Sequence, residues 1–329
     1  MITYKVQNGD TLYTIAHRFG ICAGMLARSN NIIYPCQLYE GKELIIPTYI
    51  SDREMNFVSQ GSEQELEIIK KIFSKEGSTS GGVLKFSFPR HDLKVKIGDT
   101  LIEPDLALTS WVAFNHLGKH SMLMGDLVLL EKEVEPLISS LLENGIEVTG
   151  LHNHLLHEEP RIMYLHIKGE GNSIKLAQSV KKALSLTTTP VKTKQEPSSN
   201  QFTWKVMEDI LGHKGTHKDN VLQLSIPRKI KISEDGDELP SVIGISHAIN
   251  FQALGPKVAT TGDFVLLANE VNPVISILRK NNITVTAIHN HMLTEVPRIF
   301  FMHFWAVDTP EKLAQTLKAV LNLENNNLI

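Results

Sequence analysis

The chain has 329 residues, of which 42% are hydrophobic and 21% are charged, and its formal net charge is -3 at pH 7. These values predict a globular protein of two or three domains, each large enough to bury its own core. They argue against bulk attraction to nucleic acid or anionic lipid, and no apolar run approaches the roughly 20 residues that span a bilayer.

The N-terminal residues MITYKVQNGD do not combine a basic segment with an apolar core. We therefore expect cytoplasmic synthesis without a classical signal peptide. The two cysteines, Cys22 and Cys36, both lie within the first fifty residues. We expect free thiols, with a disulfide between them as the alternative.

Residues 4–47 have the pattern of a small βααβ domain. YKVQ alternates like a strand, and NGDT predicts a turn. Apolar residues at i, i+3, i+4 and i+7 from Leu12 predict a helix that Asp10 or Thr11 caps and Gly20 ends. A second short helix and a closing strand in GKELIIP complete the domain.

This segment resembles the LysM domain. The matching positions are Tyr4, Val6, Gly9, Asp10, Thr11, Leu12, Ile15, Ala16, Leu26, Asn30, Gly41, Leu44, Ile46 and Pro47. The resemblance implies that the domain binds N-acetylglucosamine-containing glycans such as peptidoglycan or chitin in a shallow groove. The groove residues carried over are Gly9, Asp10, Thr11, Leu12, Asn30, Asn31 and Ile32. The alternative is that these residues only form turns and caps.

The rest of the chain contains one unit twice. MGDLVLL matches TGDFVLL, and GLHNHLLHEEPRIMYLH matches AIHNHMLTEVPRIFFMH. A constant offset of 137 residues separates Asp126 from Asp263 and His152 from His289. Such self-similarity indicates duplicated structural units. We expect a LysM domain at 1–48, a linker at 49–62, repeat A at 63–187, a polar linker at 188–201 and repeat B at 202–329.

The C-terminal half of each repeat has the order β-α-β-β-α. In repeat A, GDLVLL is a strand, residues 131–144 form an amphipathic helix, IEVTGLHNH and PRIMYLHIKG are strands, and SIKLAQSVKKAL is a helix. The predicted fold class is therefore α+β, with mixed or antiparallel sheets, helices on one face, and two repeats packed as a pseudo-dimer.

The paired repeats resemble the LppY/LpqO family. This resemblance does not indicate which activity, if any, the repeats have. In repeat A the residues that carry the resemblance are Pro89, Arg90, Asp92, Leu93, Trp111, Val112, Phe114, Met124 to Leu129, His152 to Leu156, Pro160, Arg161, Tyr164 and His166. In repeat B the matching run ends at Met302, His303, Phe304 and Trp305.

The histidines of each repeat form a candidate metal site. His152 and His154 share one face of a strand, and a reversal centred on Pro160 places His166 opposite His154. Three such imidazoles suit a divalent metal such as zinc, with Asp126 as a further ligand or partner. The equivalents in repeat B are His289, His291, His303 and Asp263, and Glu158 and Glu295 are the candidate general bases.

Two other interpretations of the histidines stay open: a polar seam between the repeats, and a site for an organic anion. The duplicated arginines Arg90 and Arg228, and Arg161 and Arg298, suit a carboxylate or phosphate. We favour intramolecular ion pairs for them, with Asp126 and Asp263 as candidate partners. Trp111, replaced by Ala248 in repeat B, is expected to pack in the core or an interface.

The sequence therefore predicts a peptidoglycan- or glycan-binding protein of the bacterial cell wall or spore envelope. The start directly on LysM resembles the layout of several spore-envelope proteins. The duplicated His-rich body then has a structural or adaptor role. The alternative is a metal-dependent hydrolase acting on wall material, and the sequence does not decide whether the protein is an enzyme.

Overall fold

A computed structural model gives the structure of the chain. It describes residues 2–19, 26–27, 29–30, 32, 38–46, 55–115, 121–190 and 202–326. The predictions for Asn31, Cys22 and Cys36, and for most of the 188–201 linker, lie outside the described residues.

The chain divides into two compact units. The first combines Met1–Gly61 with Ile230–Leu239 and Thr294–Pro297. The second combines Ser62–Lys229, Pro240–Leu293 and Arg298–Ile329, and so holds most of both repeats. Within the part of the chain that the structure describes, no helix is long and apolar enough to cross a membrane.

The first unit contains the predicted small domain. Strand β1 (Ile2–Lys5) pairs antiparallel with β2 (Glu43–Ile46), and helix α1 (Leu12–Arg18) packs through Leu12, Ile15 and Ala16. Thr11 rather than Asp10 caps α1, because the Thr14 amide donates to Thr11 Oγ1 at 3.1 Å. Strands β14 (Ser233–Glu234) and β15 (Asp237–Glu238) form a separate antiparallel pair in this unit.

Repeat A forms an antiparallel six-stranded sheet in the order β3-β4-β7-β8-β11-β9. Its strands are β3 (Ser78–Ser80), β4 (Val83–Pro89), β7 (Thr109–Asn115), β8 (Ser121–Leu130), β9 (Glu147–His152) and β11 (Ile162–Gly171). Its helices are α3 (Met55–Phe73), α4 (Pro104–Ala107), α5 (Glu131–Glu143) and α6 (Ser173–Leu184). A small sheet joins β10 (Glu158–Glu159), β5 (Lys96–Ile97) and β6 (Thr100–Leu101).

Repeat B forms the equivalent sheet in the order β12-β13-β16-β17-β19-β18. Its strands are β12 (Thr216–Lys218), β13 (Val221–Pro227), β16 (Ser246–Leu254), β17 (Lys257–Leu267), β18 (Thr284–His289) and β19 (Ile299–Asp308). Its helices are α7 (Lys205–Leu211), the 3-10 helix η1 (Ser241–Ile243), α8 (Ala268–Lys280) and α9 (Pro310–Asn326). The prediction of an α+β fold with two homologous repeats is confirmed.

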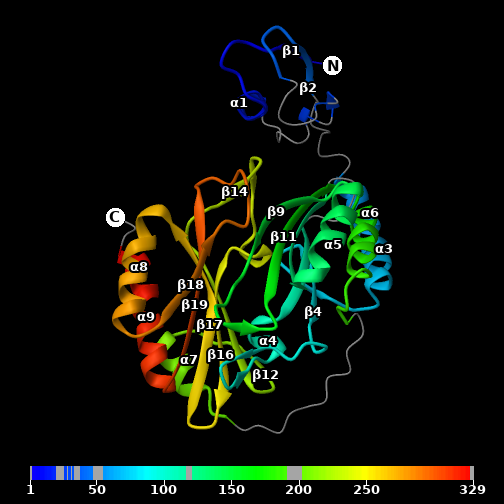
Figure 1. The fold of residues 1–329 in the computed structure, drawn as a ribbon. Helices are drawn as coiled ribbons and strands as arrows, with labels where there is room; N and C mark the ends of the chain where they lie inside the picture. Colours follow the sequence, from blue (N-terminus) through cyan, green and yellow to red (C-terminus); the bar gives the residue numbers. More distant parts are fainter. Residues whose placement is uncertain are drawn as a thin grey trace. The chain divides into compact units, whose positions relative to one another are not determined.

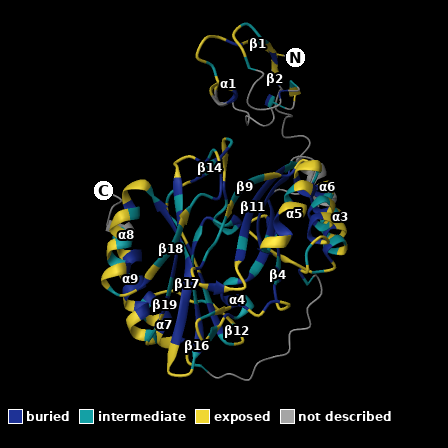
Figure 2. Cartoon of the chain, viewed as in Figure 1, coloured by how far each residue is buried: buried dark blue, intermediate teal, exposed yellow. Residues whose placement is uncertain are grey.

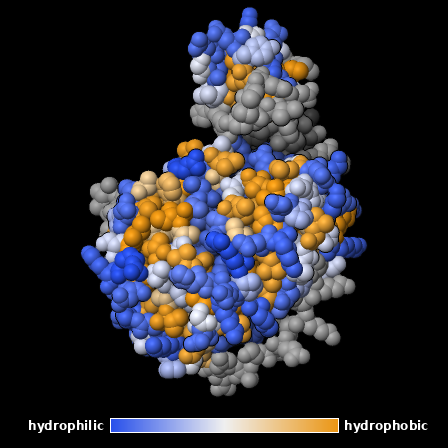
Figure 3. Space-filling view, in the orientation of Figure 1, coloured by the Kyte–Doolittle hydropathy of each residue, from blue (hydrophilic) through white to orange (hydrophobic). Residues whose placement is uncertain are grey.

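The second unit is layered. Helices α5 and α6 cover the outer side of the first sheet, α8 and α9 cover the outer side of the second, and the two sheets lie between them (Figure 1). Burial follows this arrangement, because the inner strands are dark and the outward helix surfaces are exposed (Figure 2). The face seen in Figure 3 mixes hydrophobic and hydrophilic side chains.

In each sheet, alternate residues of a strand point either into the core under the helices or into the space between the two sheets. In β11, Leu165 and Ile167 enter the core under the helices, whereas Tyr164 belongs to a second hydrophobic cluster that also contains Val221 and Ala259 of the other repeat. Since neighbouring residues in a strand point to opposite faces, His166 lies on the same face as Tyr164. The inner faces of the two sheets therefore carry the polar residues that form the site.

Candidate metal centre

Each sheet places an aspartate directly opposite a histidine on its inner face. Asp126 of β8 pairs with His166 of β11, and Asp263 of β17 pairs with His303 of β19. Residues directly opposite in an antiparallel pair project from the same face. Hence His166 Nδ1 lies 4.0 Å from Asp126 Oδ1, and His303 Nε2 lies 3.8 Å from Asp263 Oδ1.

The other four histidines come from the ends of β9 and β18. These strands end at His152 and His289, so His154 and His291 lie in the bends that follow. The asparagine between each pair holds the bend in place. Asn153 Nδ2 donates to Ile162 O, and Asn290 Nδ2 donates to Ile299 O, both at 2.7 Å.

The predicted register of these strands is wrong. A hairpin centred on Pro160 would have placed His154 opposite His166, but His152 lies opposite Tyr164, and His166 lies opposite Gly150. The connection is not a tight turn, because Glu158 and Glu159 form β10 and pair with β5. The histidines of one repeat therefore converge by a different route from the one we expected.

The six imidazoles gather in one cluster, and their shortest ring contacts cross between the repeats. Ring centroids lie 3.5 Å apart for His152 and His289, 3.6 Å for His154 and His303, and 3.8 Å for His166 and His291. Within a repeat, the His152 and His166 centroids lie 4.8 Å apart. The six histidines that we expected as two sets of three therefore lie in one composite cluster to which both repeats contribute. Which of them bind metal stays a prediction.

Among the described residues, three groups of side chains could each hold a metal ion, because the potential ligand atoms inside each group all lie within 4.8 Å of one another. They are His152 with His154, His289 and His303; His166 with His289 and His291; and Asp126 with His154 and His166. The first two groups combine residues of both repeats. In addition, His291 Nε2 lies 3.4 Å from Asp263 Oδ2.

Reciprocal hydrogen bonds fix the two His bends, which are the bend that carries His154 and the bend that carries His291, each to the other repeat. Thr149 Oγ1 donates to His291 O at 2.6 Å, and Thr286 Oγ1 donates to His154 O at the same distance. Sequence reasoning missed this pair, although the two threonines are separated by the same 137-residue offset as the histidines. They connect the strands of one repeat to the histidine-bearing segment of the other.

Aromatic rings flank the cluster and restrict the imidazoles. Tyr164 stacks on His154 with centroids 3.3 Å apart, and Phe301 stacks on His291 at 3.4 Å. Tyr164 also donates from its hydroxyl to Ala107 O at 3.2 Å. Sequence reasoning noted Tyr164 only as part of a family resemblance and did not give these two rings a place in the site.

Burial keeps the imidazoles neutral. Desolvation lowers the pKa of His152 to about 4, and it lowers the pKa values of His154, His166, His291 and His303 as well. Neutral imidazoles carry the lone pairs that coordinate metal. His152 Nε2 and His166 Nε2 lie 2.7 Å apart, so one of these rings donates a hydrogen bond to the other, in a direction set by their tautomers.

Burial disfavours the ionised form of both aspartates. Burial raises the pKa of Asp126 well above its ordinary value, with a further contribution from the negative charge of Asp263. Burial also raises the pKa of Asp263 to about 6. Two buried carboxylates on facing sheets, with imidazoles between them, form a set of donors that a divalent cation would stabilise.

Several polar atoms of the cluster have no hydrogen-bond partner among the described residues. They are Nε2 of His154, His289, His291 and His303, and Oδ1 of Asp126 and Asp263. Leaving a buried polar atom unsatisfied costs about 1–3 kcal/mol. Nitrogen and carboxylate donors at these spacings fit a divalent metal such as zinc, so the residues are compatible with a metal centre.

The two predicted general bases are not among these groups of ligand atoms. Glu158 is buried, and its Oε1 accepts from the Ile162 amide at 3.2 Å, while burial raises its pKa to about 7. Glu295 is also buried and belongs to the 294–297 segment of the first unit. Their roles as bases stay predictions.

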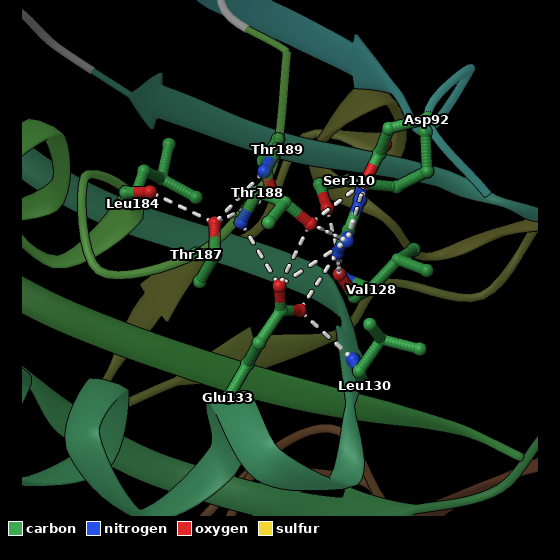
Figure 4. Close-up of polar contacts among 10 residues, drawn as sticks. Asp92, Ser110, Val128, Leu130, Glu133, Leu184, Thr187, Thr188 and Thr189 are labelled. Carbon is green, nitrogen blue, oxygen red and sulfur yellow. Dashed lines mark hydrogen bonds and ion pairs between the residues drawn. The ribbon is translucent and has the colours of Figure 1, made fainter.

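The duplicated arginines Arg90 and Arg228 form intramolecular ion pairs, but the partners differ from those expected. Arg90 donates from Nη1 to Glu133 Oε2 at 3.0 Å, and Arg228 donates to Glu270 Oε2 at 2.8 Å. Figure 4 shows Glu133 among its hydrogen-bond partners, which include the amide of Thr188. Glutamates in the first turns of α5 and α8, rather than Asp126 and Asp263, therefore pair with these arginines, and Asp92 adds a second carboxylate at Arg90.

A cavity of about 520 Å³ adjoins the cluster. Asp126, His154, Asp263, His291 and His303 line one part of it. Lys85 and Trp111 also line it, with Lys85 Nζ lying 4.1 Å from the centroid of the Trp111 ring. Sequence reasoning missed Lys85, and it expected Trp111 only in the core or an interface.

Most of the expected glycan-groove side chains have structural roles. Leu12 and Ile32 are buried in the domain core. The Asn30 side chain donates to Ile45 O and accepts from Ile45 N, and Asp10 accepts from Tyr4 and Gln7. Gly9, with a φ of +83°, and Thr11 are exposed.

Comparison with known proteins supports the domain organisation. A LysM domain model matches residues 4–47, which supports binding to a glycan that contains N-acetylglucosamine. No curated protein matches the chain significantly. Among solved structures, EtuB from Clostridium kluyveri matches with 9% identity over 76% of this chain and 90% of its own, at a TM-score of 0.20, and we infer nothing from this likeness.

A second family model matches the duplicated body. Its description is Domain of Unknown Function (DUF1259), and it matches residues 67–186 and again residues 205–323. That description does not contain the LppY/LpqO name, which therefore stays a prediction. Since the two matches cover more than half of the sequence, the chain belongs to the family described as Domain of Unknown Function (DUF1259).

Proposed function

We propose that this protein attaches through its LysM domain to peptidoglycan or a related glycan of the cell wall or spore envelope, and that its duplicated body binds divalent metal there. The observation that carries the second part is the set of buried Nε2 and carboxylate atoms in the composite cluster that make no hydrogen bond to the described residues. A polar seam that served only to join the repeats would join these atoms to one another by hydrogen bonds.

The arrangement of the cluster supports two metal positions related by the duplication. One combines His152 and His154 with His303, and the other combines His289 and His291 with His166. Asp126 and Asp263 would supply carboxylate ligands or hydrogen-bond partners. The metal in this role would hold the repeats together, which is the structural or adaptor function.

Metal content tests the proposal directly. The full chain, purified without a His tag, is expected to retain about two divalent ions per chain after gel filtration. His154→Ala and His291→Ala should each lower this content, whereas His213→Ala, which removes an exposed histidine outside the cluster, should not. A metal content at background level in the wild-type chain would contradict the proposal.

The glycan part is tested separately. The full chain should sediment with insoluble peptidoglycan, and soluble N-acetylglucosamine oligomers should release it. The double variant His154→Ala/His291→Ala should sediment equally well, because the matched LysM segment ends at residue 47. A chain that stays in the supernatant would contradict wall attachment and leave the metal proposal standing.

A hydrolase acting on wall material is the second candidate function. The observation that favours it is the cavity, because catalytic metal sites keep a position open to substrate, whereas structural sites are closed. Release of soluble fragments from peptidoglycan by the metal-loaded chain, lost in His154→Ala, would support this activity. Unchanged peptidoglycan would leave the adaptor role.

A further inference from the structure

The cavity beside the cluster has polar walls formed by the inner faces of both sheets. In β4, Leu84, Phe86 and Phe88 enter the helix-facing core, so Lys85 and Ser87 point into the cavity. Thr261 and Ser225 line it from repeat B. A polar cavity next to a proposed metal centre suits a small hydrophilic ligand rather than an apolar one.

The two repeats differ in this cavity at a cation and an aromatic ring. Lys85 of repeat A corresponds to Gln223 of repeat B, with the same offset of 138 residues as Pro89 and Pro227. Trp111 corresponds to Ala248, while Ser87 and Ser225 are identical. Lys85, Gln223, Trp111, Ala248 and the two serines all line the cavity, so at this one position repeat A has a cation where repeat B has a neutral amide.

Lys85 differs from the other lysines of the cavity in having no carboxylate within ion-pair distance among the described residues. Lys214 pairs with Glu208 at 2.9 Å, and Lys218 pairs with Asp105 at 3.0 Å. Lys85 instead lies over the Trp111 ring, an arrangement that stabilises a cation partly withdrawn from water. Its ammonium is therefore available to an anion that enters the cavity.

Burial of Lys85 agrees with this arrangement. Desolvation lowers the pKa of Lys85 to about 8, the negative charge of Asp126 opposes that shift, and the positive charge of Lys218 adds to it. An incoming anion would restore the favourable interaction that burial has removed from the ammonium.

We propose that this cavity binds a small hydroxylated organic carboxylate, with the carboxylate paired to Lys85 and the hydroxyl groups directed toward Ser87, Ser225 and Thr261. This inference deepens the proposed function, because the far end of such a ligand reaches the histidines and aspartates assigned to the metal. Lys85 and Trp111 then select for the anion, and the cluster contacts its other end.

The experiment uses D-glucuronate as the probe, D-glucose as the neutral sugar of similar size, and inorganic phosphate as a bare oxyanion. Binding to the full chain is measured by calorimetry and by tryptophan fluorescence, with Trp111→Phe identifying the signal of that ring. Glucuronate should bind saturably, and glucose at least about tenfold more weakly. Equal binding of both sugars, or binding of phosphate alone, would overturn the proposal.

Lys85→Gln introduces the residue that repeat B carries at the matching position. It should weaken glucuronate binding roughly tenfold or more, as expected for loss of a charge-assisted contact. Lys75→Gln is the matched control, because Lys75 also lies over an aromatic ring, Phe88, but does not line the cavity. Unchanged binding in Lys85→Gln, with native circular dichroism, would overturn the proposal.

Parallel titrations of metal-loaded and chelator-treated protein separate this inference from the proposed metal function. If glucuronate binds in a Lys85-dependent way and the purified chain contains only background metal, the carboxylate site is supported and the metal centre is refuted. Metal binding without Lys85-dependent binding of glucuronate would do the reverse.

Discussion

At the scale of single residues, the buried arginines show how a duplicated charge can be structural. Arg90 is fully buried and contacts Glu133, Asp92 and the Val128 carbonyl, while Arg228 makes the equivalent contacts to Glu270 and Val265. Each guanidinium connects the end of a central strand to the first turn of the helix that follows. These arginines therefore stabilise the chain reversal that leads into α5 and α8.

Arg90→Met is expected to destabilise the protein by about 3–5 kcal/mol, because it leaves the buried Glu133 carboxylate without its counter-charge. Chemical denaturation followed by circular dichroism measures the loss. Arg161→Met is the control, since Arg161 is 64% exposed and lies 3.8 Å from the equally exposed Glu131. Its effect should stay within about 0.5 kcal/mol, and equal losses in both variants would contradict the assignment.

The residue types of the candidate site could be predicted from sequence, whereas their partners could not. Duplication identified the clustered histidines and aspartates, because chance does not preserve HNH at a constant offset. It could not show that His154 lies against His303, because that contact depends on how the two sheets face each other. Lys85 could not be recognised as a site residue from the sequence, because repeat B has Gln223 at the matching position and such a difference is typical of ordinary divergence between repeats.

At the scale of elements, the glycine before each aspartate has a steric reason. A Cβ at Gly262 would lie 2.0 Å from Ala248 O, and one at Gly125 would lie 2.9 Å from Trp111 O. Both clashes are with the backbone of the neighbouring strand, which cannot move without breaking the sheet. The motif GD thus combines close strand approach with an inward carboxylate.

Gly262→Ala is therefore expected to destabilise the protein by about 2 kcal/mol or more, and Gly125→Ala by less. The difference follows from the larger overlap at Gly262, where the added methyl group would have to displace β16. Thermal unfolding of the two variants checks the order. Equal stability of both variants and the wild type would mean that the strands separate more readily than this packing implies.

The two threonines connect the duplicated elements across the interface. Thr149→Val and Thr286→Val each remove a hydroxyl that donates to a His bend of the other repeat. We expect each variant to lose about 1–2 kcal/mol of stability and to bind metal more weakly. Thr149→Ser, which keeps the hydroxyl, should restore both properties, and failure of this rescue would contradict the positioning role.

Element prediction succeeded where local patterns dominate. The helix expected at SIKLAQSVKKAL is α6, with the same bounds, because its apolar spacing and its Asn172 cap are local features. Strand pairing failed near Pro160, because β10 pairs with a strand some sixty residues earlier, and no local pattern signals that contact. Helix α3 likewise begins at Met55, inside the segment expected to be a linker.

At the scale of the whole molecule, duplication creates a site that neither repeat contains alone. Each sheet supplies an aspartate–histidine pair, and each repeat completes the cluster with a His bend held by the other. The cavity extends this composite character, because its walls also come from both sheets. Assembly of the two repeats and formation of the candidate centre are therefore one event.

The same cluster makes the metal-free protein sensitive to acid. The pKa values of its imidazoles are lowered in the folded state, to about 4 for His152, compared with about 6.5 in an unfolded chain. Below pH 6.5 the unfolded chain therefore takes up protons that the folded protein does not, and stability falls by about 1.4 kcal/mol per pH unit for each such proton.

The carboxylates act in the opposite direction. The pKa values of Asp126 and Asp263 are raised in the folded state, so both groups take up protons before an unfolded aspartate does and stabilise the protein at low pH. For Asp263, whose pKa is about 6, this contribution is lost as the pH rises through 6. Glu158, raised to about 7, behaves in the same way. The imidazoles outnumber these three groups, so we expect net loss of stability between pH 7 and pH 5.

Unfolding temperatures of chelator-treated protein measured across this range test the balance. The double variant His154→Leu/His291→Leu should show a shallower pH dependence, because two of the depressed groups are gone. His213→Leu, outside the cluster, should retain most of the wild-type slope. A wild-type stability that rises on acidification would mean that the buried carboxylates, rather than the imidazoles, dominate the proton balance of the interface.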